Sequence, residues 1–278
     1  MDATTIALLA GGLSLTMMAA WAIQQRSGSS GWVDAIWSLA VGAGGLAAVA
    51  LAPAAADPGR RWLAGALIVL WSLRLGIYIA SRTHGAGDDP RYAAMTKEWG
   101  AAAPRNMFVF LQYQAIAALV LVVAVLLAAS NPAPFPRISD AIAVVLLLGS
   151  IAGATIADAQ LARFRRDTSD RKAICEVGLW RYSRHPNYFF EWLGWCAWPL
   201  LAIDLDGANP WGWLALLAPL MMYWLLVYAS GIPPLEEHML RTRGDAFRAY
   251  QRRVNAFFPW FRRDGERPRA SLQQEIRS

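Results

Sequence analysis

Long apolar runs dominate the chain and are separated by shorter polar stretches. A membrane-spanning helix needs about 20 mostly apolar residues, because the hydrocarbon core of a bilayer is about 30 Å thick. The stretches that reach or approach this length are residues 4–23, 32–52, 62–81, 107–129, 139–158, 188–203 and 210–230. These runs are continuous, whereas the strands of a membrane barrel alternate apolar and polar residues. We therefore predict an all-α, polytopic membrane protein with seven transmembrane helices.

The composition agrees with this prediction. Apolar residues make up 56% of the 278 residues and charged residues only 17%, against about 25% charged residues in soluble domains. Because the runs fill most of the chain, we expect one membrane-embedded domain over 1–278, with four helices in 1–130 and three helices and a polar tail in 131–278. The first run lacks the basic start of a signal peptide, since Asp2 follows the initiating Met, and is expected to be a mature helix.

The distribution of Lys and Arg predicts the orientation in the membrane. With seven helices, 22 of the 26 basic residues fall in 24–31, 82–106, 159–187 and 231–278, and three fall in the connections on the other side. Basic loops stay in the cytoplasm, so the N-terminus is expected outside and the C-terminus inside. This rule, with attraction to anionic membrane lipid, accounts for the net charge of +6. We expect no nucleic-acid partner and no obligate protein partner.

The sequence also excludes several kinds of site. Its two cysteines, Cys175 and Cys196, and its three histidines show no ligand spacing, so we predict no metal site. Neither a GxGxxG nor a Walker motif occurs, which excludes a Rossmann domain. Any dinucleotide must therefore be bound by helix ends and loops.

Polar residues at membrane depth are costly, so they are candidate functional residues. Asp34 lies near the start of the second apolar run with Trp37 on the same face, and it is either an interfacial acid or part of a polar cavity. Arg74 lies in the middle of the third run, on a helical stripe with Trp71 and Tyr78. It could snorkel to the interface, form an ion pair with Asp34, or line a site.

Two further acids lie in the C-terminal half. Asp158 closes the fifth run just before the arginines of 163–166, which is either an ordinary helix end or a pairing of a hydroxyl acceptor with phosphate binders. Glu191 lies one turn into the sixth run, among aromatic residues. A glutamate in such surroundings is expensive, which favours a binding role.

The most specific motif precedes the sixth run and reads Gly-Leu-Trp-Arg-Tyr-Ser-Arg-His-Pro-Asn-Tyr-Phe-Phe-Glu over residues 178–191. Pro186 suits the first turn of a helix, where its missing N–H costs nothing. Arg181, Arg184 and His185 gather positive charge at that helix entrance, which favours anions. The Asn187 side chain can donate and accept at once, as recognition of a carboxamide requires.

This motif resembles the Arg-His-Pro-Asn-Tyr signature shared by the steroid 5-alpha-reductase family, with its bacterial relatives, and by the isoprenylcysteine and phospholipid methyltransferases. The resemblance covers most of the chain and includes Asp34 with Trp37, Arg74, residues 88–92, residues 236–241 and residues 257–260. Methyltransferases of this type usually have fewer spans, so seven spans favour the reductase branch. The resemblance implies a multi-pass protein of a bacterial inner membrane that binds NADPH from the cytoplasmic side.

The resemblance implies a cofactor-binding role for individual residues of this chain. Asn187 and Glu191 are implied to meet the nicotinamide end of NADPH, and Asp158 and Arg165 its ribose or phosphates. The other positions implied to bind NADPH or to close its cytoplasmic rim are Arg91, Tyr92, Arg171, Arg184, His185, Tyr188, Glu237 and Tyr250.

The resemblance further implies reduction of a carbon–carbon double bond conjugated to a ketone, in a lipophilic partner such as a 3-oxo-Δ4 steroid. Negative charge develops on the carbonyl oxygen, where one donor contributes about 3–4 kcal/mol. Vertebrate members hold the ketone with a helix-2 glutamate and a helix-3 tyrosine, and the matching positions here are Asp34 and Trp71. We expect Asp34 and then Tyr78 to be catalytic, and Trp37, Trp71 and Arg74 to contact substrate.

Two alternatives stay open at this stage. An S-adenosylmethionine-dependent methyltransferase acting on a lipid or prenylated substrate would use the same motif, with Glu191 at the amino group of the methionine. A transporter or lipid-binding scaffold would show internal repeats and matching broken helices. We find no such repeat, and the polar residues gather toward one side of the membrane.

Overall fold

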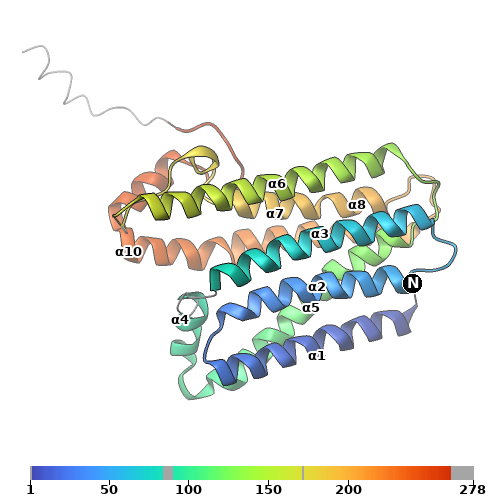
Figure 1. Cartoon of the computed structure of the whole chain (residues 1–278), viewed down its shortest axis with the longest axis horizontal. Helices are drawn as coiled ribbons and strands as arrows, with labels where there is room; N and C mark the ends of the chain where they lie inside the picture. Colours follow the sequence, from blue (N-terminus) through green and yellow to red (C-terminus); the bar gives the residue numbers. More distant parts are fainter. Residues whose placement is uncertain (1, 84–89, 171, 264–278) are drawn as a thin grey trace, which may run out of the picture. The chain divides into compact units, whose positions relative to one another are not determined.

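The computed structural model describes residues 2–83, 90–170 and 172–263, and these are almost entirely helical (Figure 1). The α-helices are α1 (Ala3–Ser27), α2 (Gly31–Leu51), α3 (Pro58–Thr83), α4 (Pro90–Trp99), α5 (Ala103–Ala129), α6 (Ile138–Asp167), α7 (Pro186–Trp195), α8 (Ala197–Ala202), α9 (Leu217–Trp224) and α10 (Ile232–Arg253). Short 3₁₀ segments include η2 (Gly178–Arg181) and η3 (Pro210–Leu216), and a π-helical turn, η4, covers Leu225–Ala229.

The prediction of an all-α, multi-pass membrane protein is confirmed. In the described part of the chain, six helical segments are long and apolar enough to cross a membrane. They are Ala3–Ser27, Gly31–Leu51, Pro58–Thr83, Arg91–Ala129, Ile138–Asp167 and Pro210–Arg253.

The predicted segment 188–203 is the exception, because it consists of two short helices. α7 ends at Trp195 and α8 begins at Ala197, with Cys196 between them. Pro199 explains the break, since it has no N–H to donate to the carbonyl of Trp195.

The described chain forms two compact units. Unit 1 consists of the described residues within Met1–Ile151 and Leu193–Tyr223, and unit 2 of those within Ala152–Trp192 and Trp224–Ser278. Unit 1 therefore contains α1 to α5, the first part of α6, the end of α7, α8, η3 and most of α9. Unit 2 contains the second part of α6, most of α7, and α10.

Small residues let the helices of unit 1 pack closely. α2 packs on α3 and α5, and α1 packs on α2 and α5, with α1, α2 and α3 drawn side by side in Figure 1. A Cβ at Gly42 would lie 2.1 Å from the Ser72 hydroxyl oxygen, and one at Gly45 would lie 2.7 Å from Ile68. The Ser72 hydroxyl donates to the Ser38 carbonyl over 2.9 Å. Close helix contacts of this kind stabilise bundles in lipid, where the hydrophobic effect between helices is absent.

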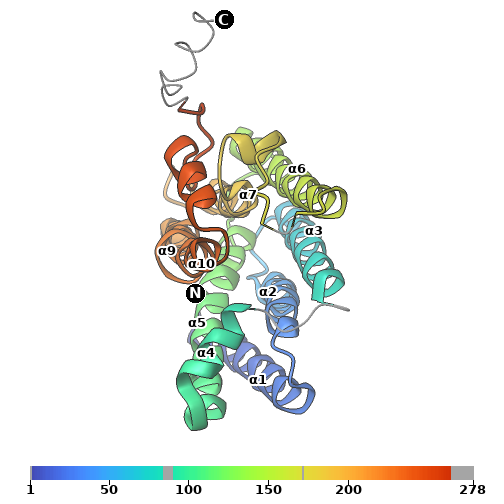
Figure 2. The same ribbon diagram turned by 90° about the vertical axis from the view of Figure 1, so that its left-hand side faces the viewer.

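Helix α4 lies against α5, as Figure 2 shows. The ring of Phe110 contacts Tyr92 edge-on, with centroids 6.0 Å apart, and also meets the Trp99 ring at 6.4 Å. On the α1 side, the Trp21 indole N–H donates to the Pro104 carbonyl over 2.9 Å. α5 is therefore the element of unit 1 on which both the N-terminal helix and α4 are fixed.

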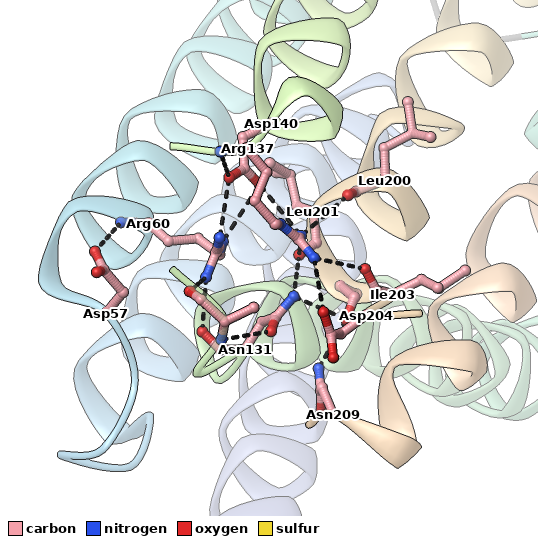
Figure 3. Close-up of polar contacts among 12 residues, drawn as sticks. Asp57, Arg60, Asn131, Arg137, Asp140, Leu200, Leu201, Ile203, Asp204 and Asn209 are labelled. Carbon is pink, nitrogen blue, oxygen red and sulfur yellow. Dashed lines mark hydrogen bonds and ion pairs between the residues drawn. The ribbon is translucent and has the colours of Figure 1, made fainter. Parts of the chain in front are cut away.

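A buried polar network joins three connections of unit 1 (Figure 3). At its centre is Arg60, in the first turn of α3, whose side chain is fully buried. Its Nε donates to one carboxylate oxygen of Asp140 over 3.3 Å, and its Nη2 donates to the other over 2.9 Å. The remaining guanidinium N–H groups donate to three backbone carbonyls, those of Asn131, Ala133 and Pro134, at 2.7 to 3.0 Å.

The same network reaches the connection between α8 and η3. The Arg137 guanidinium donates to the carbonyls of Leu201 and Ile203, both at 3.0 Å, and lies 3.4 Å from an Asp204 carboxylate oxygen. The Asn131 amide donates to the Leu201 carbonyl over 2.9 Å. All five N–H groups of Arg60 are used within the protein, so we interpret this network as a structural clamp.

Candidate functional site

The part of the motif that precedes α7, residues 178–185, docks on the C-terminal part of α6 within unit 2, and we call it the motif loop. Gly178 has a φ of +57°, and a Cβ there would lie 2.3 Å from the Gln160 side chain, so glycine is required. The Gln160 side-chain oxygen accepts from the Leu179 N–H over 2.8 Å. The Trp180 indole N–H donates to the Ala157 carbonyl over 2.9 Å.

The opposite side of the loop is held by the segment after α10, residues 254–261, which we call the strap. The Arg184 N–H donates to the Asn255 carbonyl over 2.8 Å, and the Ser183 hydroxyl donates to the Phe257 carbonyl over 2.8 Å. The Trp260 N–H donates to the Tyr182 carbonyl over 2.9 Å. The motif loop is therefore fixed from two sides before any ligand binds.

Glu236, in the second turn of α10, joins the charged residues of the motif. Its carboxylate accepts two hydrogen bonds from Arg184, at 2.7 and 3.1 Å, and lies 2.9 Å from His185 Nε2. The Gln251 amide donates to it over 2.7 Å. Arg184 also donates to the Val254 carbonyl over 2.5 Å. Paired, half-buried charges of this kind are strongly coupled, so Glu236 positions Arg184 and His185.

Sequence reasoning selected Glu237 and not Glu236. The Glu237 side chain is 69% exposed and its contact with Arg241 is long, at 3.5 Å. The sequence held no signal for Glu236, because its partners Arg184 and His185 lie about 50 residues earlier, on another element. Tyr250, another predicted cofactor residue, donates its hydroxyl proton to the Trp180 carbonyl over 2.5 Å.

The start of α7 brings Asn187 next to the end of α6. The Asn187 amide donates to an Asp158 carboxylate oxygen over 3.1 Å, and its oxygen accepts from the Tyr188 N–H over 3.1 Å. Asp158 is 4% exposed. The Tyr188 ring stacks on His185 with centroids 5.5 Å apart, and Glu191 follows one turn after Asn187, partly buried. The structure thus pairs Asp158 with Asn187, two candidate cofactor residues that the sequence analysis had assigned to different parts of NADPH.

Two other predicted cofactor residues are not part of this pair. Arg165 is exposed on the last turn of α6, as expected for a group that would meet a phosphate. Arg171 lies outside the described residues, as do Asp88 and Asp89 of the predicted loop.

A second polar cluster, within unit 1, surrounds Asp34. One carboxylate oxygen of Asp34 accepts from the Arg91 guanidinium and the other from the Tyr92 hydroxyl, each over 2.6 Å. The Gln114 amide donates to that hydroxyl over 3.0 Å, and the Trp37 indole N–H donates to the Gln114 carbonyl over 3.0 Å. Arg91 is therefore an ion-pair partner of Asp34, a role the sequence had suggested for Arg74.

The predicted helical stripe on α3, formed by Trp71, Arg74 and Tyr78, makes other contacts. The guanidinium carbons of Arg74 and Arg82 lie 5.6 and 6.0 Å from the centre of the Tyr78 ring, in cation–π geometry. Trp71 is buried and meets Trp195 edge-on with ring centroids 4.9 Å apart. The described contacts bring Tyr92, predicted as a cofactor residue, to Asp34, whereas Tyr78 lies among arginines.

Burial of His185 predicts a dependence of stability on pH. Burial lowers its pKa from the usual 6.5, against the opposing effect of the Glu236 carboxylate, so the folded protein favours the neutral ring. The unfolded chain then binds more protons, and stability is full above about pH 6.5 and declines as pH falls below it. We expect the loss of melting temperature between pH 7.5 and 5.5 to be smaller in His185→Gln. An equal loss in both proteins would contradict this assignment.

Comparison with known proteins gives one match. Residues 20–254 match the family model described as "Protein of unknown function (DUF1295)", a range that includes Asp34, the motif loop and Glu236. No curated protein and no solved structure matches the chain.

Proposed function

The chain belongs to the DUF1295 family, and we propose that it is a membrane-embedded, NADPH-dependent reductase of the carbon–carbon double bond of an α,β-unsaturated ketone. Its substrate would be lipophilic, of the 3-oxo-Δ4 steroid type. The resemblance of residues 178–191 to the steroid 5-alpha-reductases supports the activity. The observation that carries the proposal is the Asp158–Asn187 pair, held at 3.1 Å by a loop that is fixed on both sides.

The residues of unit 2 fit NADPH in chemical kind. Asn187 offers a carboxamide donor and acceptor, Asp158 an acceptor for a ribose hydroxyl, and exposed Arg165 a guanidinium that suits the 2′-phosphate. When bound, NADPH supplies the hydride. Arg184, His185 and Tyr250 bond to protein groups, so we assign them to positioning the loop.

The cluster around Asp34 supplies the groups that polarisation of a ketone requires. A neutral phenol is a good donor to an oxygen that gains negative charge, and donors of this kind contribute most when they are fixed in advance. The buried Tyr92 hydroxyl donates its one proton to Asp34 and accepts from Gln114. To polarise a ketone it would turn that proton from the Asp34 carboxylate to the ketone oxygen. We therefore extend the predicted catalytic role of Asp34 to its partner Tyr92.

A methyltransferase that uses S-adenosylmethionine is the second candidate. The described residues contain six long apolar segments, and the segment 188–203 is split into two short helices. Methyltransferases with the same signature usually have fewer spans than the reductases. Six candidate spans are closer to the methyltransferase number than the seven that we predicted. Glu191 would then meet the amino group of the methionine.

Ligand-dependent stability separates the two candidates. Purified protein in detergent is titrated with NADPH, NADH and S-adenosylmethionine, and its thermal unfolding is followed. A ligand at a hundredfold excess over its Kd stabilises the folded state by about 2.7 kcal/mol. We expect this response to NADPH, with its loss in Asn187→Ala and its retention in Asn106→Ala, a control on α5 in unit 1. Reduction of a 3-oxo-Δ4 steroid is then measured by oxidation of NADPH.

The outcomes differ clearly for the two candidates. Stabilisation by S-adenosylmethionine alone would refute the reductase and favour the methyltransferase. If NADPH stabilises the wild type and the Asn187→Ala variant equally, the assignment of the site to the Asp158–Asn187 pair is wrong.

A further inference from the structure

The strap ends in large aromatic side chains that the described structure leaves exposed. Phe258, Trp260 and Phe261 are 48%, 63% and 78% exposed, and Tyr182 beside them is 41% exposed. We call these four residues the aromatic patch. Together with Pro259, three of them line an open hollow of about 380 Å³. Clustered exposed aromatic residues on a protein mark a contact surface, because their exposure to water is unfavourable.

The patch is rigidly attached, so its exposure is not that of a loose tail. The Trp260 N–H bonds the Tyr182 carbonyl over 2.9 Å, and the Arg263 N–H bonds the Arg253 carbonyl over 2.9 Å. Beneath it, Phe257 is 4% exposed. The strap therefore presents these rings at a defined place on unit 2.

An aromatic cluster connects the patch to a helix of the membrane domain. The Phe258 ring contacts Phe189 and Trp192 of α7, with centroids 6.0 and 5.7 Å apart, and Phe257 contacts the same two rings at 5.8 and 5.7 Å. Phe189 and Trp192 open the apolar segment predicted over 188–203. The loop to which the patch is bonded docks on the C-terminal part of α6, one of the six candidate spans. The patch therefore lies near the end of a span, which is where aromatic side chains gather in membrane proteins.

Two exposed arginines of the described residues, Arg181 and Arg263, lie next to the patch in sequence. The acid nearby, Glu176, is already paired with Arg253 at 2.6 Å and with Arg262 at 3.1 Å, so it does not neutralise the two exposed arginines. Basic residues beside interfacial aromatic residues favour anionic lipid headgroups.

We propose that the aromatic patch is an interfacial anchor that binds anionic phospholipid of the bilayer in which the chain is embedded. The rings enter the headgroup and upper acyl region, and Arg181 and Arg263 bind the headgroup phosphates. The hollow is shallow and lined by aromatic rings and proline, which suits an acyl chain better than a polar small molecule. The anchor fixes the strap, and through it the motif loop, to the membrane surface. It does not depend on the proposed reductase activity.

Site-directed quenching in lipid nanodiscs tests the anchor. The full chain, with Cys175 and Cys196 replaced by Ala, receives one fluorophore through Phe261→Cys, and a matched protein receives it through Asp245→Cys, whose native side chain is 97% exposed on α10. We expect lipid carrying a nitroxide near the headgroup to quench the label at 261 and not the label at 245. Labelled phosphatidylglycerol should quench more than labelled phosphatidylcholine.

The arginines give the quantitative test. Arg181→Gln and Arg263→Gln, in the protein labelled at 261, should each reduce the preference for phosphatidylglycerol about fivefold, with no change in melting temperature. Strong but equal quenching by both lipids would refute the binding of anionic lipid. Quenching at 261 by aqueous iodide as strong as at 245, without quenching by lipid, would refute the anchor itself.

Discussion

Glu236→Gln is expected to destabilise the protein by about 3–5 kcal/mol, the usual cost of removing one partner from a buried ion pair. The Arg184 and Glu236 side chains are 10% and 12% exposed, so the arginine would lose its counter-charge with little access to water. The new amide would also place N–H groups against the donors of Arg184 and Gln251, which now donate to both carboxylate oxygens.

The adjacent acid provides a matched control for this prediction. Glu237→Gln removes the same charge one position later, from a side chain that is 69% exposed, and should change stability by less than about 1 kcal/mol. Thermal unfolding of both variants in the same detergent gives the comparison. Glu236→Gln should also abolish stabilisation by NADPH, since the motif loop loses its support. Equal melting temperatures for the two variants would show that Glu236 does not hold the loop.

Arg60→Ala is expected to have an effect of similar size, in unit 1. The substitution removes all five hydrogen bonds of the guanidinium and leaves the Asp140 carboxylate, which is 1% exposed, with only Arg137 as its cation. Three backbone carbonyls lose their donor as well. A cost of about 3–5 kcal/mol is the usual result of removing one partner from a buried ion pair.

The control for Arg60 is the next residue. Arg61 donates to the carbonyls at the end of α2, at 3.2 Å to Val49 and 3.5 Å to Ala50, so Arg61→Ala should cost about 1 kcal/mol or less. Asp140→Asn should resemble Arg60→Ala, because it leaves Arg60 buried without a counter-charge. If Arg60→Ala and Arg61→Ala unfold at the same temperature, the network does not clamp the three connections.

Much of the membrane fold follows from the apolar runs. The runs 4–23, 32–52 and 107–129 correspond to α1, α2 and α5 within a few residues, because hydrophobic length is a strong signal. α4 and α10 were not predicted as helices. Both carry charged residues along their length, so a search for apolar runs treats them as loop and tail, although their polar residues reach the candidate sites.

The candidate site was only partly predictable. Asn187 and Asp158 were both selected from the sequence as candidate cofactor residues, but their direct hydrogen bond was not predicted. The meeting of Arg91 and Tyr92 with Asp34, and of Glu236 with Arg184, joins residues 52 to 58 positions apart. Spacing along one helix carries no information about such pairs, since they depend on how separate helices pack.

The Arg60 network has a consequence for how the chain is assembled in the membrane. Every acceptor of the Arg60 guanidinium lies between Asn131 and Asp140, about 70 residues later than Arg60 in the order of synthesis. The backbone carbonyls that accept from Arg137 come later still, from Leu200 to Ile203. While the ribosome is still making α5, the growing chain holds a bare cation at the start of α3. The start of α3 therefore cannot reach its final bonded state until the connection after α5 has been made.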